Sequence, residues 1–458
     1  MRVDAWIYVG ERMRLEDGAV RQLRDAAALP GVVKVLATPD IHLGYGVPIG
    51  CVLAMDGAVV PAAVGYDVNC GMRLMTTPLK ANTTKVGKLA RSVARDIPLG
   101  EGKSNVRFSA DQLRRLLARG LDALPEVAGA GGHRVWGGYD EAEVARDAQC
   151  TEEFGRLAGD PDAIPPRALQ RGMPQLGTLG GGNHFVELQR VDAVLDAGLA
   201  ERLGIFAGQL VVMIHSGSRG LGHEIGGHFM KLAAQVSGAR SPNQHLCFLP
   251  ADSDEGRAYV GAMNAAANFA FVNREMMTLL VRLNLRRSLG AIELPIIYDV
   301  PHNMAKLERH EGKELWVHRK GATRAFPASR LPADSPYKDV GQPVIIPGSM
   351  GTASYLLVGN ERSAATLHSV NHGAGRTMSR TQAAGKRRRG KVLRPPAISD
   401  EAFAKAMKGI DLIAADKWSV REEAPQAYKD IDRVMETVLG AGLAEGVARM
   451  VPLAVMKG

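Results

Sequence analysis

The sequence predicts a mixed α/β fold in which buried β-strands are flanked by helices. Three observations lead to this prediction. Short apolar segments rich in β-branched residues, typical of buried strands, occur at 209–218 and 294–300. Segments whose apolar residues recur at helical spacing lie between and around them. The chain has 458 residues, and 46% of them are hydrophobic, so it is long enough for a large core in one domain or two.

Helical periodicity defines the remaining regular elements. Two amphipathic segments lie early in the chain. A long, strongly apolar helical segment lies in the middle, and two further helical segments lie near the end. The five segments predicted to be helices are 88–97, 109–124, 265–289, 401–416 and 428–444. Because strands and helices alternate along the chain, the predicted class is α/β rather than all-α or all-β.

One segment is predicted to be a loop, and a second has two interpretations. Residues 334–343, DSPYKDVGQP, have the composition of a surface loop. Residues 386–396, KRRRGKVLRPP, form a basic run that ends in prolines. That run is either a solvated loop or a contact for a polyanion.

Charge and cysteine content restrict the class of protein. The net charge of +9 suits a polyanionic partner but is weak evidence by itself. The four cysteines form no CxxC pair, which fits a reducing compartment. No apolar run reaches the roughly 18 residues of a membrane span, and the N-terminus lacks a signal-peptide pattern. We therefore expect a cytoplasmic protein that does not enter a membrane.

Five side chains are suited to a transition metal. Asp67 and Cys70 lie in GYDVNCG, and a thiolate favours Zn, Mn or Fe-type ions over Mg or Ca. From that motif alone, a buried cysteine beside a capping aspartate is the favoured interpretation. His184 follows a glycine run, and two apolar segments end at His215 and His302, where sites usually form. Their residue types would allow two ions with a shared thiolate, but their spacing decides nothing.

A second candidate site surrounds His372 in HGAGRTMSR. Small residues beside this imidazole leave backbone N–H groups free to face a phosphate, and Arg376 and Arg380 add charged donors. PGSMGTASY adds the hydroxyls of Ser349 and Ser354. The pattern indicates phosphate handling, and a neutral imidazole attacks phosphorus when metal ions withdraw charge from the phosphate.

Other motifs resemble known sites but lack their spacing. HEIGGH (223–228) places its histidines five apart, which separates them by roughly 140° around a helix, so it does not match the zinc-binding HExxH. GYGVPIG lacks the GxGxxG spacing of dinucleotide sites. A bound nucleotide must therefore be held in another way.

Nine sequence blocks, in the same order, resemble those of the RtcB-type RNA ligases. They run from about residue 36 to the last residue, and no motif residue is missing. The blocks are PDIHLGYGVPIG, GYDVNCG, GTLGGGNHFVE, HSGSRGLGH, HNMAK, HRKGATRAFP, PGSMGTASY, HGAGRTMSR and EAPQAYKDI, followed by a C-terminal MKG. The resemblance implies one large domain over residues 1–458, with buried β-sheets flanked by helices.

The resemblance also implies an activity and its cofactors. The family uses GTP and Mn²⁺ to join RNA 2′,3′-cyclic phosphate or 3′-phosphate ends to 5′-hydroxyl ends. His372 would become guanylylated, with Asp40 orienting its ring. The metal ligands would be Asp67, Cys70, His184, His215 and His302, holding two manganese ions with Cys70 between them.

The remaining implied roles concern the nucleotide and the RNA. Nucleotide contacts would come from Asn183, Glu187, Asn303, Ser349, Ser354, Gly373, Tyr428 and Lys457. The RNA phosphates would meet Arg219, Lys320, Arg376 and Arg380. Glu187 would accept hydrogen bonds from guanine N1–H and the amino group, which adenine cannot offer.

Two other functions remain open at this level. A metal-dependent phosphohydrolase acting on nucleotides or cyclic phosphates would use the same ligands without a histidine adduct. A non-catalytic RNA-binding module would use the metal for structure only. The ligase interpretation also leaves room for an activating protein partner, and a monomer is the default expectation.

Overall fold

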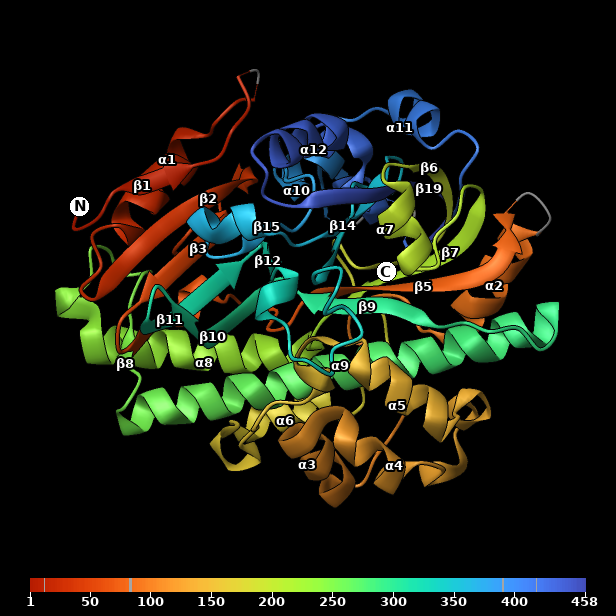
Figure 1. The fold of residues 1–458 in the computed structure, drawn as a ribbon, viewed down its shortest axis with the longest axis horizontal. Helices are drawn as coiled ribbons and strands as arrows, with labels where there is room; N and C mark the ends of the chain where they lie inside the picture. The colour runs from red at the N-terminus through yellow and green to blue at the C-terminus, as the bar shows by residue number, and fades with distance from the viewer. Residues whose placement is uncertain (12, 82–84, 389–390, 417) are drawn as a thin grey trace.

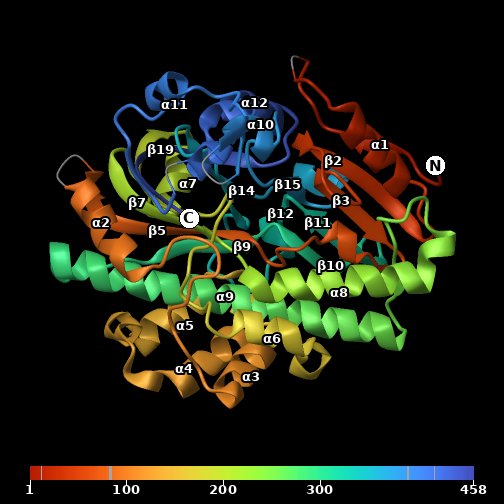
Figure 2. The ribbon, with the colours of Figure 1, turned by 180° about the vertical axis from the view of Figure 1, so that it is seen from behind.

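The computed structural model describes residues 1–11, 13–81, 85–388, 391–416 and 418–458. Its fold is mixed α/β, as predicted. Two long helices, α8 (Arg219–Ser237) and α9 (Asp254–Leu289), run side by side across the middle of the molecule (Figure 1). The two main sheets lie on one side of this pair and a group of short helices lies on the other, as the view from behind also shows (Figure 2). Within the described residues, no helix has the length and apolar character needed to cross a membrane.

The larger sheet has eight strands and carries most of the candidate site. Its order is β13-β14-β19-β6-β7-β5-β9, with β18 added beside β19. Only the β18–β19 pair is parallel. The predicted strands 209–218 and 294–300 are confirmed as β7 and β9. The bounds are β5 Gly71–Lys80, β6 Phe185–Val194, β7 Gln209–Ser216, β9 Ile296–Pro301, β13 Pro343–Ile346, β14 Ser354–Val358, β18 Asp411–Ala414 and β19 Glu445–Lys457.

The second main sheet has five strands in the order β1-β2-β3-β11-β10. Its strands are β1 Ala5–Ile7, β2 Val32–His42, β3 Ile49–Met55, β10 Asn303–His310 and β11 Lys313–Lys320. Three two-stranded ribbons complete the β-structure. They pair β4 Ala58–Val59 with β8 Leu249–Pro250, β12 Ala322–Arg324 with β15 Ser369–Asn371, and β16 Lys386–Arg388 with β17 Lys391–Arg394.

The shorter helices surround the sheets and the α8–α9 pair. They are α1 Asp17–Ala26, α2 Val86–Asp96, α3 Ala110–Arg119, α4 Leu124–Val127, α5 Glu141–Gln149, α6 Pro166–Gly172, α7 Ala197–Arg202, α10 Arg380–Ala384, α11 Asp400–Ala406 and α12 Ile431–Gly440. The predicted helices 88–97 and 428–444 are confirmed as α2 and a shorter α12.

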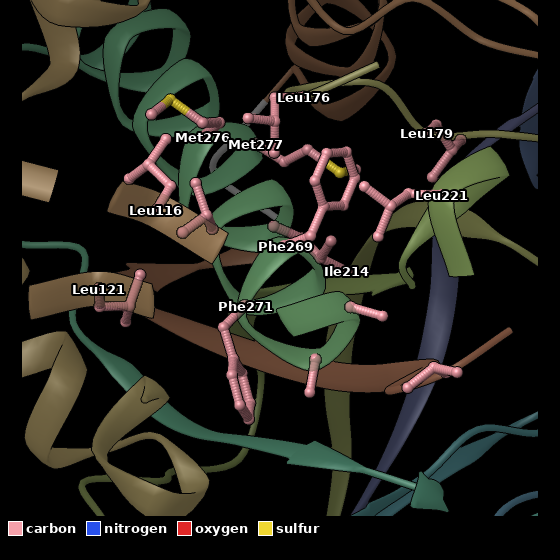
Figure 3. Close-up of a cluster of buried hydrophobic side chains, with 14 of the residues drawn as sticks. Leu116, Leu121, Leu176, Leu179, Ile214, Leu221, Phe269, Phe271, Met276 and Met277 are labelled. Carbon is pink, nitrogen blue, oxygen red and sulfur yellow. The ribbon is translucent and has the colours of Figure 1, made fainter. Parts of the chain in front are cut away.

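Helix α9 is longer than predicted and forms the centre of the core. It begins before residue 265, at a cap in which the Ser253 hydroxyl accepts a hydrogen bond from the Gly256 N–H at 3.0 Å. Side chains on all its sides are buried between Ala262 and Leu285. Figure 3 shows part of this core, where Phe269 and Met277 lie among leucines from other elements. A helix that is buried all round is typical of the centre of a large core.

Three predictions need correction. The predicted helix 401–416 is wrong in its second half, because Gly409 has a φ of +83° and residues 411–414 pair with β19 as a strand. The predicted helix 109–124 is interrupted after Arg119, where Gly120 has a φ of +58°. The basic run 386–396 contains the β16–β17 ribbon rather than a plain loop, although residues 389–390 lie outside the described residues.

The segment 334–343 has no helix or strand before Pro343, so the loop prediction holds for its backbone. It is not wholly at the surface, because the Tyr337 side chain is buried and its hydroxyl donates to the Ile297 carbonyl. That residues 1–458 form a single domain stays a prediction.

Candidate active site

Four neighbouring strands bring the predicted metal ligands to one edge of the larger sheet. β6 begins at Phe185, opposite His215 near the end of β7. Gly71, at the start of β5, pairs with Ser216 on one side and with Pro301, the last residue of β9, on the other. Residues that precede β5 and β6 therefore meet residues that end β7 and follow β9. This antiparallel register, rather than sequence spacing, gathers the ligand set.

The gathered side chains are Asp67, Cys70, His184, His215 and His302, which we call the thiolate–imidazole cluster. Cys70 Sγ lies 3.3 Å from His184 Nε2 and 3.2 Å from His215 Nε2. His184 Nε2 is 2.8 Å from Asp67 Oδ2, and His215 Nε2 is 3.4 Å from His302 Nε2. Ligand atoms of Cys70, His184 and His215 all lie within 4.8 Å of one another. Such convergence of sulfur, nitrogen and carboxylate atoms suits a transition-metal ion.

The imidazoles are held in the form that binds metals. His184 Nδ1 lies 3.2 Å from the Leu179 carbonyl, and His215 Nδ1 lies 3.1 Å from the Asn183 carbonyl. An Nδ1–H that donates to a carbonyl leaves the lone pair on Nε2, which is the nitrogen that faces the cluster. Burial also holds the pKa values of His215 and His302 well below their usual range, so both rings stay neutral.

The acidic members of the cluster respond to one another. Although burial raises it, the pKa of Asp67 is held at about 2 by the neighbouring His184 and Arg219. Burial and the neighbouring Asp67 raise the pKa of the Cys70 thiol well above its usual value. A divalent cation between these groups would lower the pKa of the Cys70 thiol again, because it stabilises a thiolate directly.

A buried arginine of α9 holds the backbone next to Cys70 and next to His215. Arg274 donates to the Asn69 carbonyl at 2.8 Å and to the Ser216 carbonyl at 2.9 Å. Its own charge is balanced by Asp299, with the closest contact at 2.7 Å. Although burial raises it, the pKa of Asp299 is lowered by Arg274 and Arg73. The core helix thereby sets the position of the loop that carries Cys70.

His372 follows β15 and is oriented by a buried carboxylate. Its Nδ1 lies 2.6 Å from Asp40 Oδ2, and its backbone N–H donates to the same oxygen at 3.2 Å. Asp40 is completely buried and also accepts from the Thr38 hydroxyl at 2.6 Å. Although burial raises it, the pKa of Asp40 is lowered by His372. Since Nδ1 faces the carboxylate, Nε2 is the ring nitrogen left for a substrate. The centroids of the His372 and His302 rings are only 4.9 Å apart.

A pocket of about 410 Å³ joins the two candidate sites. Most of the residues predicted from the sequence line it. These are Asp67, Cys70, Asn183, His215, His302, Asn303, Ser349, His372, Gly373, Arg376, Arg380, Tyr428 and Lys457. Asp40 and His184 do not line the pocket but contact residues that do: Asp40 contacts His372, and His184 contacts Asp67. The phosphate-handling segment and the thiolate–imidazole cluster are therefore parts of one site.

Glu187 and Ser354 lie deeper in the protein than the lining residues. Glu187 is 1% exposed, and its Oε2 accepts from Gln189 Nε2 at 2.5 Å. The same nitrogen lies 3.1 Å from the Ser354 hydroxyl. Glu187 Oε1 is buried without a hydrogen-bond partner. Burial raises the pKa of Glu187 to about 7 and lowers that of the nearby Lys457 to about 8. An unsatisfied buried acceptor suits a ligand that donates hydrogen bonds.

The two predicted phosphate-binding arginines of HGAGRTMSR share one carboxylate, Glu423. Arg376 Nη1 lies 3.2 Å from it and Arg380 Nε lies 3.0 Å from it. Tyr428 donates its hydroxyl to Glu423 and lies under the Arg376 guanidinium. Although burial raises it, the pKa of Glu423 is held at about 2 by Lys457 and the two arginines. We call Arg376, Arg380, Glu423, Tyr428 and Lys457 the Glu423 cluster.

The other two predicted phosphate contacts are occupied elsewhere in the structure. The buried Lys320 ammonium donates to the carbonyls of Ala62, at 3.0 Å, and of Tyr45. Arg219 begins α8 with a φ of +56°, a left-handed conformation that is unfavourable for arginine, and its Nε lies 3.4 Å from the Thr178 hydroxyl. Neither residue lines the pocket as the structure describes it.

Three residues of the site were not predicted from the sequence. His42 lines the pocket, and its ring centroid is 6.5 Å from that of His372. Arg274 lies in an ordinary helical sequence and carries no local signal. His42 and Glu423 do have one, since they stand in the blocks PDIHLGYGVPIG and EAPQAYKDI.

Comparisons with known proteins identify the family of this chain. A family model described as tRNA-splicing ligase RtcB matches residues 22–458. The chain is 43% identical to the tRNA-splicing ligase RtcB of Thermococcus kodakarensis, covering 100% of this chain and 95% of that protein. It is 40% identical to the tRNA-splicing ligase RtcB of Methanococcus maripaludis, again covering 100% and 95%. It is also 41% identical to RNA-splicing ligase RtcB homolog 1 of Entamoeba dispar, covering 96% of this chain and 82% of that protein. The chain belongs to the RtcB family.

Proposed function

We propose that this protein is an RNA ligase that uses GTP and Mn²⁺. It joins RNA ends that carry a 2′,3′-cyclic phosphate or 3′-phosphate to ends that carry a 5′-hydroxyl. The relatives named tRNA-splicing ligases support tRNA halves as a substrate, and repair of broken RNA uses the same chemistry.

The observation that carries this proposal is the setting of His372. Its Nδ1 is 2.6 Å from Asp40, and its ring is 4.9 Å from that of His302. Its Nε2, the ring nitrogen not taken up by Asp40, therefore belongs to a side chain that lines the pocket beside the thiolate–imidazole cluster. A nucleophile oriented by a carboxylate, with cation ligands next to it, is the arrangement that covalent phosphoryl transfer requires.

The residues present fit a metal pair. Neutral imidazoles, one thiolate and one carboxylate suit Mn²⁺ better than Mg²⁺. Asp67, Cys70, His184, His215 and His302 would hold the ions, and the Cys70 sulfur lies close to the Nε2 atoms of both His184 and His215. When bound, the ions would withdraw charge from the triphosphate and stabilise the leaving pyrophosphate.

The first covalent step takes place on His372. Its Nε2 attacks the α-phosphorus of GTP, an N–P bond forms, the P–O bond to the leaving group breaks, and pyrophosphate departs. The ring gains positive charge in this step. Asp40, which already accepts from Nδ1–H, offsets that charge without any movement.

The RNA reacts in the next two steps. A cyclic phosphate end is first hydrolysed to a 3′-phosphate. An oxygen of that phosphate attacks the GMP phosphorus and displaces His372, which leaves the RNA 3′ end joined to GMP. The 5′-hydroxyl then attacks the RNA phosphorus, a phosphodiester forms, GMP leaves and the hydroxyl proton is released. Activation of the 3′ end supplies the leaving group that a phosphomonoester lacks.

Guanine recognition would use groups that lie behind the lining of the pocket. Glu187 Oε1 is a buried acceptor without a partner. The Gln189 amide nitrogen, which donates to the other oxygen of Glu187, also contacts the Ser354 hydroxyl. In its ionised form Glu187 accepts from N1–H and the amino group of guanine, whereas adenine offers no such pair. Tyr428 and Lys457 line the same pocket. GTP is therefore the expected nucleotide.

Labelled substrates test the proposal. We expect GTP labelled at the α-phosphate, with Mn²⁺, to transfer its label to the wild-type protein and not to His372→Ala. We also expect tRNA halves with a 2′,3′-cyclic phosphate and a 5′-hydroxyl to be joined by the wild type alone. A phosphohydrolase would release labelled GMP or phosphate without a protein adduct. A non-catalytic RNA-binding module would give neither adduct nor joined product.

A further inference from the structure

A contiguous row of exposed aromatic side chains lies outside the site described so far. Its members are Tyr45, Tyr66, His223 and His245, all of them exposed. Ring centroids are 5.0 Å apart for His245 and Tyr45, and 5.8 Å apart for Tyr45 and Tyr66. Tyr66 and His223 stack at 4.8 Å with their planes 22° apart. We call these four residues the aromatic row. Single exposed aromatics need no explanation, but a contiguous group marks a binding surface.

The aromatic row starts at the edge of the pocket. Tyr66 directly precedes Asp67, and Tyr45 follows Leu43 by two residues. Both Asp67 and Leu43 line the pocket. Two residues of extended chain span at most about 7 Å, so the first rings stand within one side-chain length of the pocket lining. A polymer with one end at His372 would pass over these rings if it left the pocket on this side.

The backbone under the row is fixed by its neighbours. The Lys320 ammonium donates to the Tyr45 carbonyl, and His245 Nδ1 lies 3.2 Å from the Tyr45 hydroxyl. Helix α8 presents Gly226 to the Tyr66 segment, where a Cβ would lie 2.9 Å from the Gly65 carbonyl oxygen. This close approach seats Tyr66 against the helix and beside His223. Rings that are already in place lose little freedom when a ligand binds.

Stacking on nucleobases is the chemistry that such a row offers. Every base has a π face, and aromatic side chains beside a nucleic-acid site bind single strands by stacking. A protein partner is less suitable, since an ordinary interface of about 800 Å² per partner centred here would extend over the pocket. We propose that the aromatic row binds unpaired bases of the RNA next to its reacting end. This inference rests on the proposed ligase function and adds the place where the rest of the substrate is held.

Binding of a fluorescently labelled single-stranded RNA with a 3′-phosphate, followed by anisotropy, tests the row directly. We expect Tyr66→Leu to bind about tenfold more weakly than the wild type, because one stacking contact is lost. Tyr66→Phe keeps the ring and should restore binding. Trp6→Leu is the matched control, since Trp6 is 59% exposed on strand β1 and does not line the pocket. Equal affinity of Tyr66→Leu and the wild type would overturn the proposal.

A second arm uses the wild-type protein, so it does not depend on the folding of a variant. Single abasic sites are placed at successive positions from the reacting end, in the 3′-phosphate strand and separately in the 5′-hydroxyl strand. We expect at least one position to weaken wild-type binding about tenfold, with no further loss in Tyr66→Leu. The strand that shows the effect is the one that crosses the row. Two results would rule the row out. One is equal binding of all abasic RNAs. The other is that the affinity lost through the abasic site adds to the affinity lost through Tyr66→Leu.

Parallel assays separate the two proposals. Guanylylation and joining by the wild type, without any abasic or Tyr66 effect, would refute the row and leave the ligase function standing. If the wild type itself shows neither guanylylation nor joining, the ligase function is refuted, whatever the anisotropy shows.

Discussion

The thiolate–imidazole cluster and the Glu423 cluster face the same pocket but are built differently. In the first, side chains converge on one another, and Arg274 of α9 holds the backbone next to Cys70 and His215. In the second, opposite charges already satisfy one another through Glu423. On the proposed function, a cation would complete the first arrangement, and a phosphate of the ligand would compete with the Glu423 carboxylate in the second. The proposed catalytic groups would then be preorganised, whereas the charges proposed to bind the RNA would exchange partners.

The largest effect is expected from removing a ligand of the thiolate–imidazole cluster. His215→Ala or His302→Ala should reduce guanylylation to background, because each change opens the set that would hold the cations. The protein should still fold, as checked by its thermal unfolding. His228→Ala, an exposed histidine on α8, is the matched control and should guanylylate normally. Full guanylylation in either ligand variant would contradict the assignment.

Removing the arginine behind that cluster tests whether its preorganisation is real. Arg274→Met leaves the buried Asp299 carboxylate with Arg73 alone. We expect the free energy of unfolding to fall by about 3–5 kcal/mol, the usual cost of breaking a buried pair. Denaturant unfolding of the metal-free protein measures this.

The control for that variant is Arg114→Met, which breaks an exposed pair with Asp162 and should change the stability little. A loss in Arg274→Met no larger than in Arg114→Met would mean that α9 does not fix the loop of Cys70.

Glu423→Gln tests the exchange of partners in the Glu423 cluster. With the carboxylate charge gone, Arg376 and Arg380 are free to meet phosphates. We expect the slope of log affinity for RNA against log salt to become steeper by about one or two. Salt titrations of RNA binding measure the slope. A weaker affinity with an unchanged slope would show instead that Glu423 orients the arginines rather than competing for them.

The smallest expected effect concerns pH and Glu187. Burial raises its pKa to about 7, above the unfolded value of about 4.3. The folded state therefore holds this proton more tightly, and its free energy of unfolding falls as pH rises from about 4 to about 7. The fall is at most about 1.4 kcal/mol per pH unit. Glu187→Gln should remove this component, as urea unfolding at several pH values would show. Identical pH curves for both proteins would place the titration elsewhere.

Local sequence predicted much of the site but little of its support. His372, Cys70 and the strand-end histidines stand in glycine-rich or apolar contexts that set them apart from ordinary polar residues. Their meeting depends on the register of β6, β7, β5 and β9, which no spacing along the chain encodes. Arg274 and Glu423 were missed because an arginine in a long helix and a glutamate in a short turn are typical surface residues.

The errors in secondary structure have a similar origin. Residues 411–414 have apolar spacing that fits a helix, but their pairing with β19 makes them a strand. The apolar periodicity that predicts the helix 265–289 does not extend to the start of α9, which is set by the Ser253 cap. Tertiary pairing and capping, rather than apolar periodicity, decide both cases.

The central claim is that His372 carries GMP covalently, and the mass of the intact protein tests it most directly. After incubation with GTP and Mn²⁺, the wild type should gain the mass of one GMP, located on the peptide that contains His372. His372→Ala should gain nothing. No added mass on the wild type, or an adduct that persists in His372→Ala, would contradict the account.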